Sequence, residues 1–449
     1  MAITNNEVTT TSVNSHQTHR SQMHPSPSPP LTPPIITKDQ VRAQLKKLRI
    51  NKAAGPDRLC PRLLKACAAE LGEPLKHIFN LSLRLGQVPS LWKTSCLTPV
   101  PKKPHPSELN DYRPVALTSH VMKTMERLVL GMLRPQVRHA LDPLQFAYQE
   151  KVDVDDAITY LLHRTHSHLD KGKSAVRIMF FDFSSAFNTI QPLRLGYKLL
   201  QMGVDAHLER AGGGVQEPGG GLCAMVQTQS SSTQHFKDQR RWWWISVRSK
   251  PTLLPVPING VNVEVVSTYK YLGLHLDNKL DWSANTDALY KKGQRRLYFL
   301  RRLRSFNVCS KLLRMFYQSV VASVLFYAVV CWGGSTKKKD AGRIDRLVRK
   351  AGSVVGAELE CITSLSDKRT LNKLINILDN ECHPLHSTIV KQKSLISWRL
   401  RSLPCTTDRL RKSFVPRAIE LFNASLKGRG EIDFSAQSVC LFTPSMFGY

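Results

Sequence analysis

Asp182 is the carboxylate whose place in the sequence most suggests chemistry. It follows an apolar run, residues 175–181, that predicts a buried strand, and the residues after it predict a helix. A carboxylate at such a strand end is a hard oxygen ligand of the kind that Mg²⁺ prefers. Two-metal displacement at a phosphate needs further carboxylates from an adjacent strand, and no such pair follows downstream. A carboxylate that only caps the helix is the alternative.

The charge balance indicates a polyanionic partner. Lys and Arg number 64 against 34 Asp and Glu, which gives a formal net charge of +30 over 449 residues. Nucleic acid is the natural partner, because phosphate neutralisation releases counterions and supplies most non-specific affinity. An anionic membrane surface is the alternative.

Cysteine usage and hydropathy indicate an intracellular protein. The ten cysteines are scattered, without a Cys-x-x-Cys pair, and the polar first residues show no secretory signal. The uncharged stretch 315–332 is near the shortest length that crosses a bilayer, but polar residues interrupt it and basic residues flank it. We expect a buried helix there and no stable membrane insertion.

Periodicity predicts several elements before Asp182. Residues 1–37 are rich in Pro and Ser and predict a disordered linker. Apolar residues at helical spacing predict helices that begin near 38, at 119–133 and at 154–168. Residues 96–103 predict an extended segment with a basic end. The adjacent Asp155 and Asp156 predict the acidic start of the helix 154–168 rather than a metal-binding hairpin.

A set of motifs in a fixed order resembles the reverse transcriptases of non-LTR (LINE-type) retrotransposons. The motifs are residues 51–57 (NKAAGPD), 99–103 (PVPKK), 112–117 (YRPVAL), 145–148 (QFAY), 181–187 (FDFSSAF) and 268–273 (TYKYLG). Each alone is weak, and their order carries the resemblance. It implies an RNA-directed DNA polymerase, a nucleotidyltransferase that uses Mg²⁺ and binds an RNA template and a DNA primer.

The resemblance also implies residue roles. Asp182 would be the first metal-binding and catalytic carboxylate, and the backbone carbonyl of Phe183 would help hold the same ion. Phe187 would lie under the sugar of an incoming nucleotide. Lys102, Lys103 and Arg113 would grip the template and the triphosphate, since Lys and Arg pair well with phosphate oxygens.

The chain departs from the family pattern after Asp182. The family's Gln-Gly-x-x-x-Ser-Pro segment and Tyr-Ala-Asp-Asp hairpin are both missing. Residues 206–250 hold instead a low-complexity Gly, Gln, Ser and Trp-rich segment without periodicity. We hypothesise a deletion with a reading-frame slip; a natural flexible insertion is the alternative. The expected fold is α+β, a truncated and internally disrupted right-hand polymerase with fingers and the first part of the palm at 38–205.

Downstream order is predicted to return. Residues 251–306 are expected to hold a palm-end, primer-grip-like hairpin around Asn259-Gly260, a further strand at 269–276, and a basic helix. Residues 307–449 are expected to form a mostly helical, basic thumb or C-terminal region. Basic stretches at 291–304, 337–350 and 391–412 predict helices with one apolar and one cationic face. The expected nucleic-acid-binding residues of the first stretch are Lys291, Lys292, Arg295, Arg296, Arg301, Arg302 and Arg304.

Two functions of different class remain open. One is an active RNA-templated DNA polymerase, in an intact or complemented form. The other is an inactive fragment that keeps non-specific RNA and DNA binding, which the missing carboxylates favour. A remote alternative is a segment of an alkylated-DNA-repair-type tRNA-modifying dioxygenase or methyltransferase. It is suggested by similarity over 267–306 and by His275 and Asp277, although a turn also explains those two residues.

Overall fold

The computed structural model describes residues 34–172, 175–181, 191–205, 241–246, 257–258, 261–262, 264–397 and 399–427. The chain divides into two compact units. We call the described residues of 5–148 and 183–237 the N-terminal unit, and those of 149–182 and 238–449 the C-terminal unit. The expected segment 38–205 is therefore shared between both units, because residues 149–182 pack with the C-terminal one.

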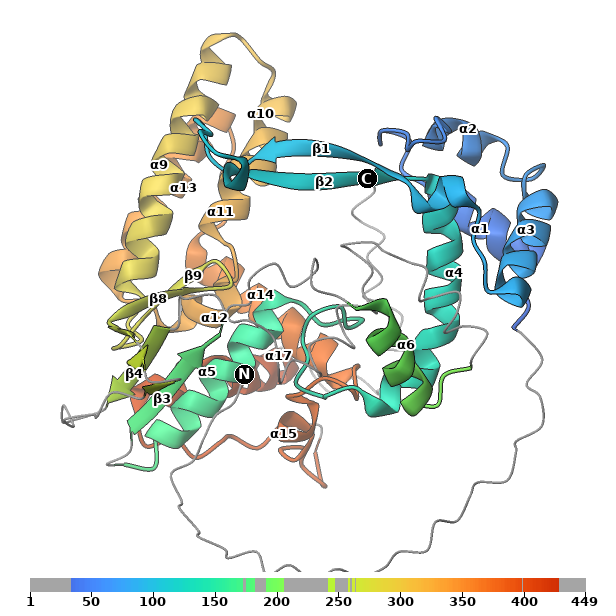
Figure 1. Ribbon diagram of the computed structural model, residues 1–449. Coiled ribbons are helices and arrows are strands. Elements are labelled where there is room, and N and C mark those ends of the chain that lie inside the picture. Colours follow the sequence, from blue (N-terminus) through green and yellow to red (C-terminus); the bar gives the residue numbers. More distant parts are fainter. Residues whose placement is uncertain are drawn as a thin grey trace, which may run out of the picture. The chain divides into compact units, whose positions relative to one another are not determined.

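The N-terminal unit is a helical core from which a long two-stranded ribbon extends (Figure 1). Its elements are α1 (Lys38–Lys46), α2 (Pro61–Ala66), α3 (Gly72–Leu85), η1 (Ser90–Lys93), β1 (Ser95–Pro101), η2 (Leu109–Asp111), β2 (Tyr112–Thr118), α4 (His120–Val137), η3 (Arg138–Ala140) and α6 (Pro192–Gln201). The apolar faces of α1, α3, α4 and α6 share one core that includes Val41, Phe79, Met125 and Leu199. The helices expected near 38 and at 119–133 are thereby confirmed.

Strands β1 and β2 pair antiparallel, from Ser95 opposite Thr118 to Pro101 opposite Tyr112. Every residue of β1 is exposed. The ribbon is therefore held by its own ladder and by its junction with α4, where the Ser119 side chain accepts the N–H groups of Val121 and Met122.

The C-terminal unit combines small sheets with a helical array. Its elements are α5 (Val154–Leu169), β3 (Ala175–Phe180), β4 (Arg241–Ser246), β5 (Pro257–Ile258), β6 (Val261–Asn262), β7 (Glu264–Val266), β8 (Thr268–Tyr271), β9 (Leu274–Asp277), α9 (Ser283–Ser305), α10 (Ser310–Phe316), the π-helical turn η4 (Tyr317–Ala322), α11 (Ser323–Leu325), α12 (Val329–Trp332), η5 (Gly333–Ser335), α13 (Lys338–Val355), α14 (Ile362–Leu378), α15 (His386–Val390), α16 (Asp408–Arg411) and α17 (Phe414–Lys427). The expected helix 154–168 and strand 175–181 are confirmed as α5 and β3.

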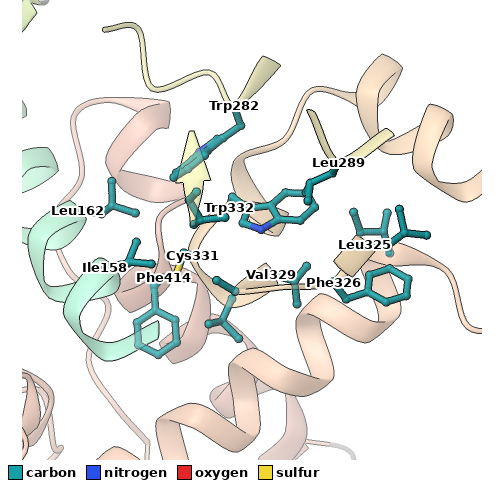
Figure 2. Packing of buried hydrophobic residues seen from close by; sticks show 14 of the residues in the cluster. Ile158, Leu162, Trp282, Leu289, Leu325, Phe326, Val329, Cys331, Trp332 and Phe414 are labelled. Atoms are coloured by element: carbon teal, nitrogen blue, oxygen red, sulfur yellow. The ribbon is translucent and has the colours of Figure 1, made fainter. Parts of the chain in front are cut away.

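A single apolar core joins α5, β3, β9 and the helices from α9 to α17 other than α16. Figure 2 shows its centre, where Trp282, Leu289 and Trp332 lie together and Ile158 of α5 faces Phe414 of α17. The large buried rings explain why helices far apart in sequence form one unit, since burying each large apolar side chain contributes about 1.5–3 kcal/mol.

The apolar stretch that follows α9 lies partly inside this core. Ser310–Ser335 has the length and composition of a helix that could cross a membrane, and half of its most apolar window is buried in the unit. Its path is interrupted, since Ala328 has a φ of 48° and opens α12 in the left-handed region. Tyr317, Val321 and Trp332 are buried, which confirms the expected burial.

Three expectations need correction. Residues 269–276 form two strands, because Leu272 (φ 46°) and Gly273 (φ 93°) make a turn that pairs β8 antiparallel with β9. Within 206–250, residues 241–246 form β4, since Trp and Ile favour strands. Among the described residues of 391–412, only those of α16 are helical; the others are extended or in turns, with Pro404 among them. The hairpin expected around 259–260 is confirmed by the pairing of Ile258 with Val261.

Candidate functional site

The strand that leads to Asp182 is held by an aromatic stack. Phe180, the last residue of β3, stacks on Tyr269 of β8 with centroids 4.0 Å apart and planes at 11°, and contacts Tyr271 at 5.1 Å. Burial raises the pKa of Tyr271 to about 12, so its ring stays neutral. The motif TYKYLG thus supports the end of β3. Asp182, Phe183 and Phe187 themselves lie outside the described residues.

Strand β4 lies next to β3, so its residues determine which metal ligands an adjacent strand could offer to Asp182. Strand β4 pairs antiparallel with β3, with Arg241 opposite Phe180 and Trp243 opposite Ile178. On its other side β4 pairs in parallel with β7, where Glu264 is the partner of Arg241. The sequence of β4 is RWWWIS, so the strand that pairs with the Asp182 strand contains no acidic residue.

Mg²⁺ sets a clear requirement for the residues around this strand end. Mg²⁺ takes hard oxygen ligands, and a two-metal site needs several of them from adjacent strands. Within the described ranges no group of three His, Cys, Asp or Glu side chains could hold a metal ion. Strand β4, the strand that pairs with β3, has no acidic residue in its sequence, and Glu264 of β7 lies one strand further along the same sheet.

The ribbon of the N-terminal unit places its predicted phosphate-binding residues near one end. The Lys102 N–H donates to the carbonyl of Asp111 at 2.7 Å, and Lys103 Nζ lies 2.8 Å from Asp111 Oδ2. The hydrogen bond from Lys103, followed by those from Ser107 and Glu108, lowers the pKa of Asp111. Arg113 is exposed on β2, opposite Val100. Asp111 thus fixes the turn and partly neutralises Lys103.

The NKAAGPD motif fixes the other end of the ribbon. Ser119 Oγ donates to Asp57 Oδ2 at 2.5 Å, and His120 Nε2 lies 2.8 Å from the carbonyl of Ala53. A Cβ on Gly55 would lie 2.6 Å from the backbone carbon and oxygen of Thr118. Only glycine allows this approach, so the motif clamps the junction of β2 and α4.

Helix α9 carries the predicted nucleic-acid-binding residues. Leu297 and Leu300 are buried, Leu303 is partly buried, and Gly293 lies so near Leu325 and Leu347 that a Cβ would meet them at 2.6 and 3.0 Å. This confirms the expected apolar stripe. The exposed cations on the other faces are Lys291, Lys292, Arg295, Arg301, Arg302 and Arg304. In the described part of the chain, no carboxylate forms an ion pair with any of these six.

Arg296 differs from its neighbours. It is half-buried, and its Nη1 donates to the carbonyl of Val320 at 2.5 Å. The guanidinium therefore ties α9 to the π-helical turn η4. Its prediction as a nucleic-acid contact remains a prediction, but a protein partner already occupies one of its donors.

Three aromatic side chains on α9 and just after it were not predicted as part of this surface. Tyr298, Phe299 and Phe306 are 59%, 56% and 67% exposed. The Arg302 guanidinium lies 5.2 Å above the ring of Phe306, and Tyr298 meets Phe299 edge to face at 5.6 Å. The i, i+4 spacing of Tyr298, Arg302 and Phe306 places them on one face of the helix and could have predicted this surface. The prediction used only the leucine stripe and the cations.

Asp155 and Asp156 open α5, as expected. Asp153 is the N-cap, and its side chain and that of Asp156 exchange hydrogen bonds with backbone N–H groups in a capping box. Their contacts with α14 were not predicted: Lys373 Nζ lies 2.8 Å from Asp153 Oδ2 and 3.0 Å from Asp156 Oδ1. His383 Nε2 lies 3.1 Å from the same Asp156 oxygen.

This buried cluster has a defined protonation pattern. The Leu385 N–H donates to His383 Nδ1 at 3.0 Å, which places the proton of a neutral His383 on Nε2, facing Asp156. Neither that nitrogen nor Asp156 Oδ1 meets hydrogen-bond geometry, so the contacts are chiefly electrostatic. Burial alone would raise the pKa of Asp156. His383, the Asp153 N–H and Lys373 lower the pKa by more than burial raises it, so that its net value is about 2. Burial and Asp153 raise the pKa of Asp155 to about 6.

His275 and Asp277 do not form part of a facial triad in the described structure. Asp277 Oδ1 accepts the N–H groups of Lys279 and Asp281 at 3.0 and 3.2 Å, which is a turn after β9. Leu274 and Leu276 point into the core from the alternate positions. A local turn accounts for the pattern.

Comparison with known proteins identifies the class to which this ribbon and sheet are related. Residues 100–219 match the family described as reverse transcriptase (RNA-dependent DNA polymerase). The match begins at the end of β1, spans β2, α4, α5, β3 and α6, and ends before β4.

Relatives with established names come from mobile elements. The RNA-directed DNA polymerase from mobile element jockey of Drosophila melanogaster is 27% identical across 36% of this chain and 18% of the relative. The probable RNA-directed DNA polymerase from transposon BS of the same species is 24% identical across 82% of this chain and 49% of the relative. The Pol polyprotein from type-1 retrotransposable element R1 of Bradysia coprophila is 23% identical across 37% of this chain.

These matches confirm the resemblance to a non-LTR, LINE-type reverse transcriptase. The chain spans about half the length, or less, of the curated relatives that it matches. A mixed α and β composition, as expected, agrees with a polymerase fold.

A second, short match concerns residues 282–323, which resemble the N-terminal segment of alkylated DNA repair protein alkB homolog 8. These residues form α9, α10 and η4, with no strand among them. The match is small and does not favour a dioxygenase or methyltransferase.

Proposed function

We propose that this chain is a catalytically inactive fragment of a retrotransposon RNA-directed DNA polymerase that keeps non-specific binding of RNA and DNA. The observation that carries the proposal is β4. The strand beside the Asp182 strand begins with Arg241 and continues with Trp242–Trp244, where a two-metal site would need carboxylates.

The energetic argument follows from the charges. Two Mg²⁺ ions need several carboxylates to offset their charge, and the residue of β4 in register with the end of β3 is Arg241 rather than an acid. Metal ions contribute several kcal/mol of transition-state stabilisation in such reactions, and each 1.4 kcal/mol corresponds to about a tenfold change in rate. In the family Mg²⁺ would supply this stabilisation; here we propose weak or absent binding.

Binding is supported by the surface of α9. Six exposed cations without carboxylate partners in the described structure lie on one helix, and the whole chain carries a charge of +30. Three exposed aromatic rings lie among them, and aromatic rings stack on bases of any sequence when the strand is single. We therefore propose a preference for single-stranded segments over duplex, with little sequence dependence.

The ribbon residues Lys102, Lys103 and Arg113 are proposed as a second phosphate-contacting group. Lys103 already pairs with Asp111, whereas Arg113 is exposed on β2. An RNA template and a DNA primer are the partners that the family suggests. We also propose that the chain acts inside the cell, which agrees with exposed free thiols at Cys60, Cys96 and Cys309.

A salt titration tests the binding proposal. The full chain is titrated onto a fluorescein-labelled RNA of mixed sequence at salt concentrations from about 50 to about 200 mM. We expect log Kd to rise steeply with log salt. The variant Arg301→Gln/Arg302→Gln/Arg304→Gln should weaken binding and reduce that slope by about two, because each lost phosphate contact on a single strand removes about 0.7.

The matched control removes the same charge from α1 and the residues after it. Arg42, Lys46 and Lys47 are exposed on the N-terminal unit, and Arg42→Gln/Lys46→Gln/Lys47→Gln should leave the slope within about 0.5 of the starting value. Equal effects of the two triple variants would mean that net charge, rather than the α9 surface, governs binding. Salt-independent binding would contradict the proposal altogether.

A further inference from the structure

Residues 391–397 and 399–401 form the two sides of a short hairpin that the proposed function has not used. We call it the 391–401 hairpin. Lys393 and Leu400 form a β-bridge, the Ser394 N–H donates to the carbonyl of Arg399 at 3.0 Å, and the Arg401 N–H donates to the carbonyl of Gln392 at 2.6 Å. At its tip, Ser394 Oγ accepts the N–H groups of Ile396 and Ser397 at 3.3 and 3.2 Å.

The hairpin is fixed to the helical core. Leu400 is buried, and Asn423 of α17 bonds to both sides of its peptide backbone: the Leu400 N–H donates to Asn423 Oδ1 at 3.0 Å, and Asn423 Nδ2 donates to the Leu400 carbonyl at 2.7 Å. Two directed hydrogen bonds and a buried anchor hold the base of the hairpin in one orientation.

The tip carries two aliphatic side chains that contact nothing in the described structure. Leu395 is 103% exposed and Ile396 is 98% exposed, the highest values among the exposed large apolar residues described. An exposed Leu is ordinary by itself. Two adjacent ones, presented by a hydrogen-bonded tip, need a reason.

The rest of the hairpin is cationic. Lys391, Lys393, Arg399 and Arg401 are exposed, and residues 391–401 include no acid. Among the described residues no carboxylate forms an ion pair with these four, and the Arg401 guanidinium donates instead to the carbonyl of Lys391 at 3.0 Å. The arrangement is two aliphatic side chains at the end of a positively charged stem.

We infer that the 391–401 hairpin is a wedge that inserts Leu395 and Ile396 between adjacent base pairs of a nucleic-acid duplex. The inference rests on the proposed binding of nucleic acid and adds a second, structurally distinct contact to it. Small apolar wedges of Leu, Ile, Met or Phe unstack one base step, and the lost stacking is offset by contacts of neighbouring cations with phosphates. The stem cations lie next to the tip in the sequence and fit that role.

The small apolar surface of the hairpin tip favours a base step over a protein partner or a lipid bilayer. A protein partner needs an interface of about 800 Å² on each side, and the two side chains of the tip provide a small part of it. A bilayer anchor needs more apolar surface than two aliphatic side chains, since even one long acyl chain binds membranes only marginally. A base step needs one or two side chains of this size and nearby positive charge.

Fluorescence of 2-aminopurine tests the wedge. A short duplex carries the probe at a central base step, and the full chain is added until binding, followed by anisotropy of a terminal dye, is complete. We expect the 2-aminopurine signal to rise on binding because the step unstacks. Leu395→Ser/Ile396→Ser should bind with a Kd within about threefold of that of the unaltered chain. Its rise in 2-aminopurine fluorescence should be about fivefold smaller.

The control is Leu193→Ser, which removes another aliphatic side chain, 91% exposed, from α6 of the N-terminal unit. It should leave both signals unchanged. Lys393→Gln/Arg399→Gln should weaken binding and lower the salt slope, while the rise at saturation persists.

Each other outcome overturns the wedge in a recognisable way. No binding by the unaltered chain refutes the proposed function and the wedge together. Binding without a rise, or a rise that survives Leu395→Ser/Ile396→Ser, refutes the wedge alone. If the double variant instead abolishes sedimentation with anionic lipid vesicles while the 2-aminopurine rise persists, the tip contacts membranes and not bases.

Discussion

Removing Asp156 should destabilise the C-terminal unit far more than an ordinary surface substitution. Its residue exposure is 1%, and its carboxylate faces Lys373 Nζ at 3.0 Å and His383 Nε2 at 3.1 Å. The Lys373 side chain is 12% exposed. Asp156→Asn keeps the shape but leaves Lys373 with Asp153 alone, and breaking a buried pair in this way costs about 3–5 kcal/mol.

The same substitution defines a double-mutant cycle with Lys373→Met. Each single change removes one charge of the Asp156–Lys373 pair and leaves the other buried, whereas the double change removes both charges. We expect the double variant to be less destabilised than the sum of the singles, with a coupling of about 1–3 kcal/mol. Asp287→Asn is the control, because Asp287 is 51% exposed in its pair with Arg343 and should cost less than about 1 kcal/mol.

The pH dependence of the cycle has a definite sign. The pKa of Asp156 is lowered from 3.8 to about 2 in the folded chain. A depressed carboxyl pKa contributes stability above the unfolded value that is lost as pH falls through the folded value; here the shift is worth about 2 kcal/mol. The cost of Asp156→Asn should therefore be constant above pH 4 and shrink between pH 4 and pH 2.

Hydrogen exchange of α5 and α14 peptides, read by mass spectrometry, measures this unit separately from the other. Its free energies of opening give the cycle directly. Additive single effects, within about 0.5 kcal/mol, would refute the buried cluster as a coupled unit. So would a cost of Asp156→Asn that stays the same down to pH 2.

Three further predictions concern other parts of the fold. Gly55→Ala should destabilise the N-terminal unit by about 1–3 kcal/mol in hydrogen exchange of α4, because the new Cβ meets the backbone of Thr118, whereas Gly131→Ala on α4, with open space around it, should not destabilise it. Cys331, whose pKa burial raises well above its ordinary value, should resist a thiol reagent until the chain unfolds, while exposed Cys60 and Cys96 react at once. Burial lowers the pKa of His166 to about 3, so stability should fall as pH drops from 6.5 toward 3, and His166→Gln should lessen that fall.

Local pattern was sufficient to predict the elements that bury one regular face. The stripe of Val41 and Leu45, the Ser119 cap and the apolar run up to Phe180 identify α1, α4 and β3, because helix and strand periods are properties of neighbouring residues. The turn at Leu272 and Gly273 was missed. Its positive φ values are stabilised by Tyr327, whose hydroxyl donates to the Leu272 carbonyl at 2.8 Å from 55 residues away.

The site was predictable where the motif is contiguous and not where the contacts are distant. The cationic face of α9 follows from its own sequence, whereas Asp153 and Lys373 meet across 220 residues and no local signal pairs them. The strand formed by 241–246 was missed for a related reason. Strand β4 forms because it pairs with β3, which precedes it in the sequence, and with β7, which follows it. Its own residues show no regular alternation of apolar and polar side chains.

Primer extension tests the central claim most directly. An oligo(dT) primer on poly(rA) is saturated with the full chain. Deoxythymidine triphosphate is then added with Mg²⁺ or Mn²⁺. The account predicts a bound template and no extension of the primer in either metal. Extension of the primer that disappears in Asp182→Asn would contradict it, because it would mean that carboxylates from outside β4 complete a working site with Asp182.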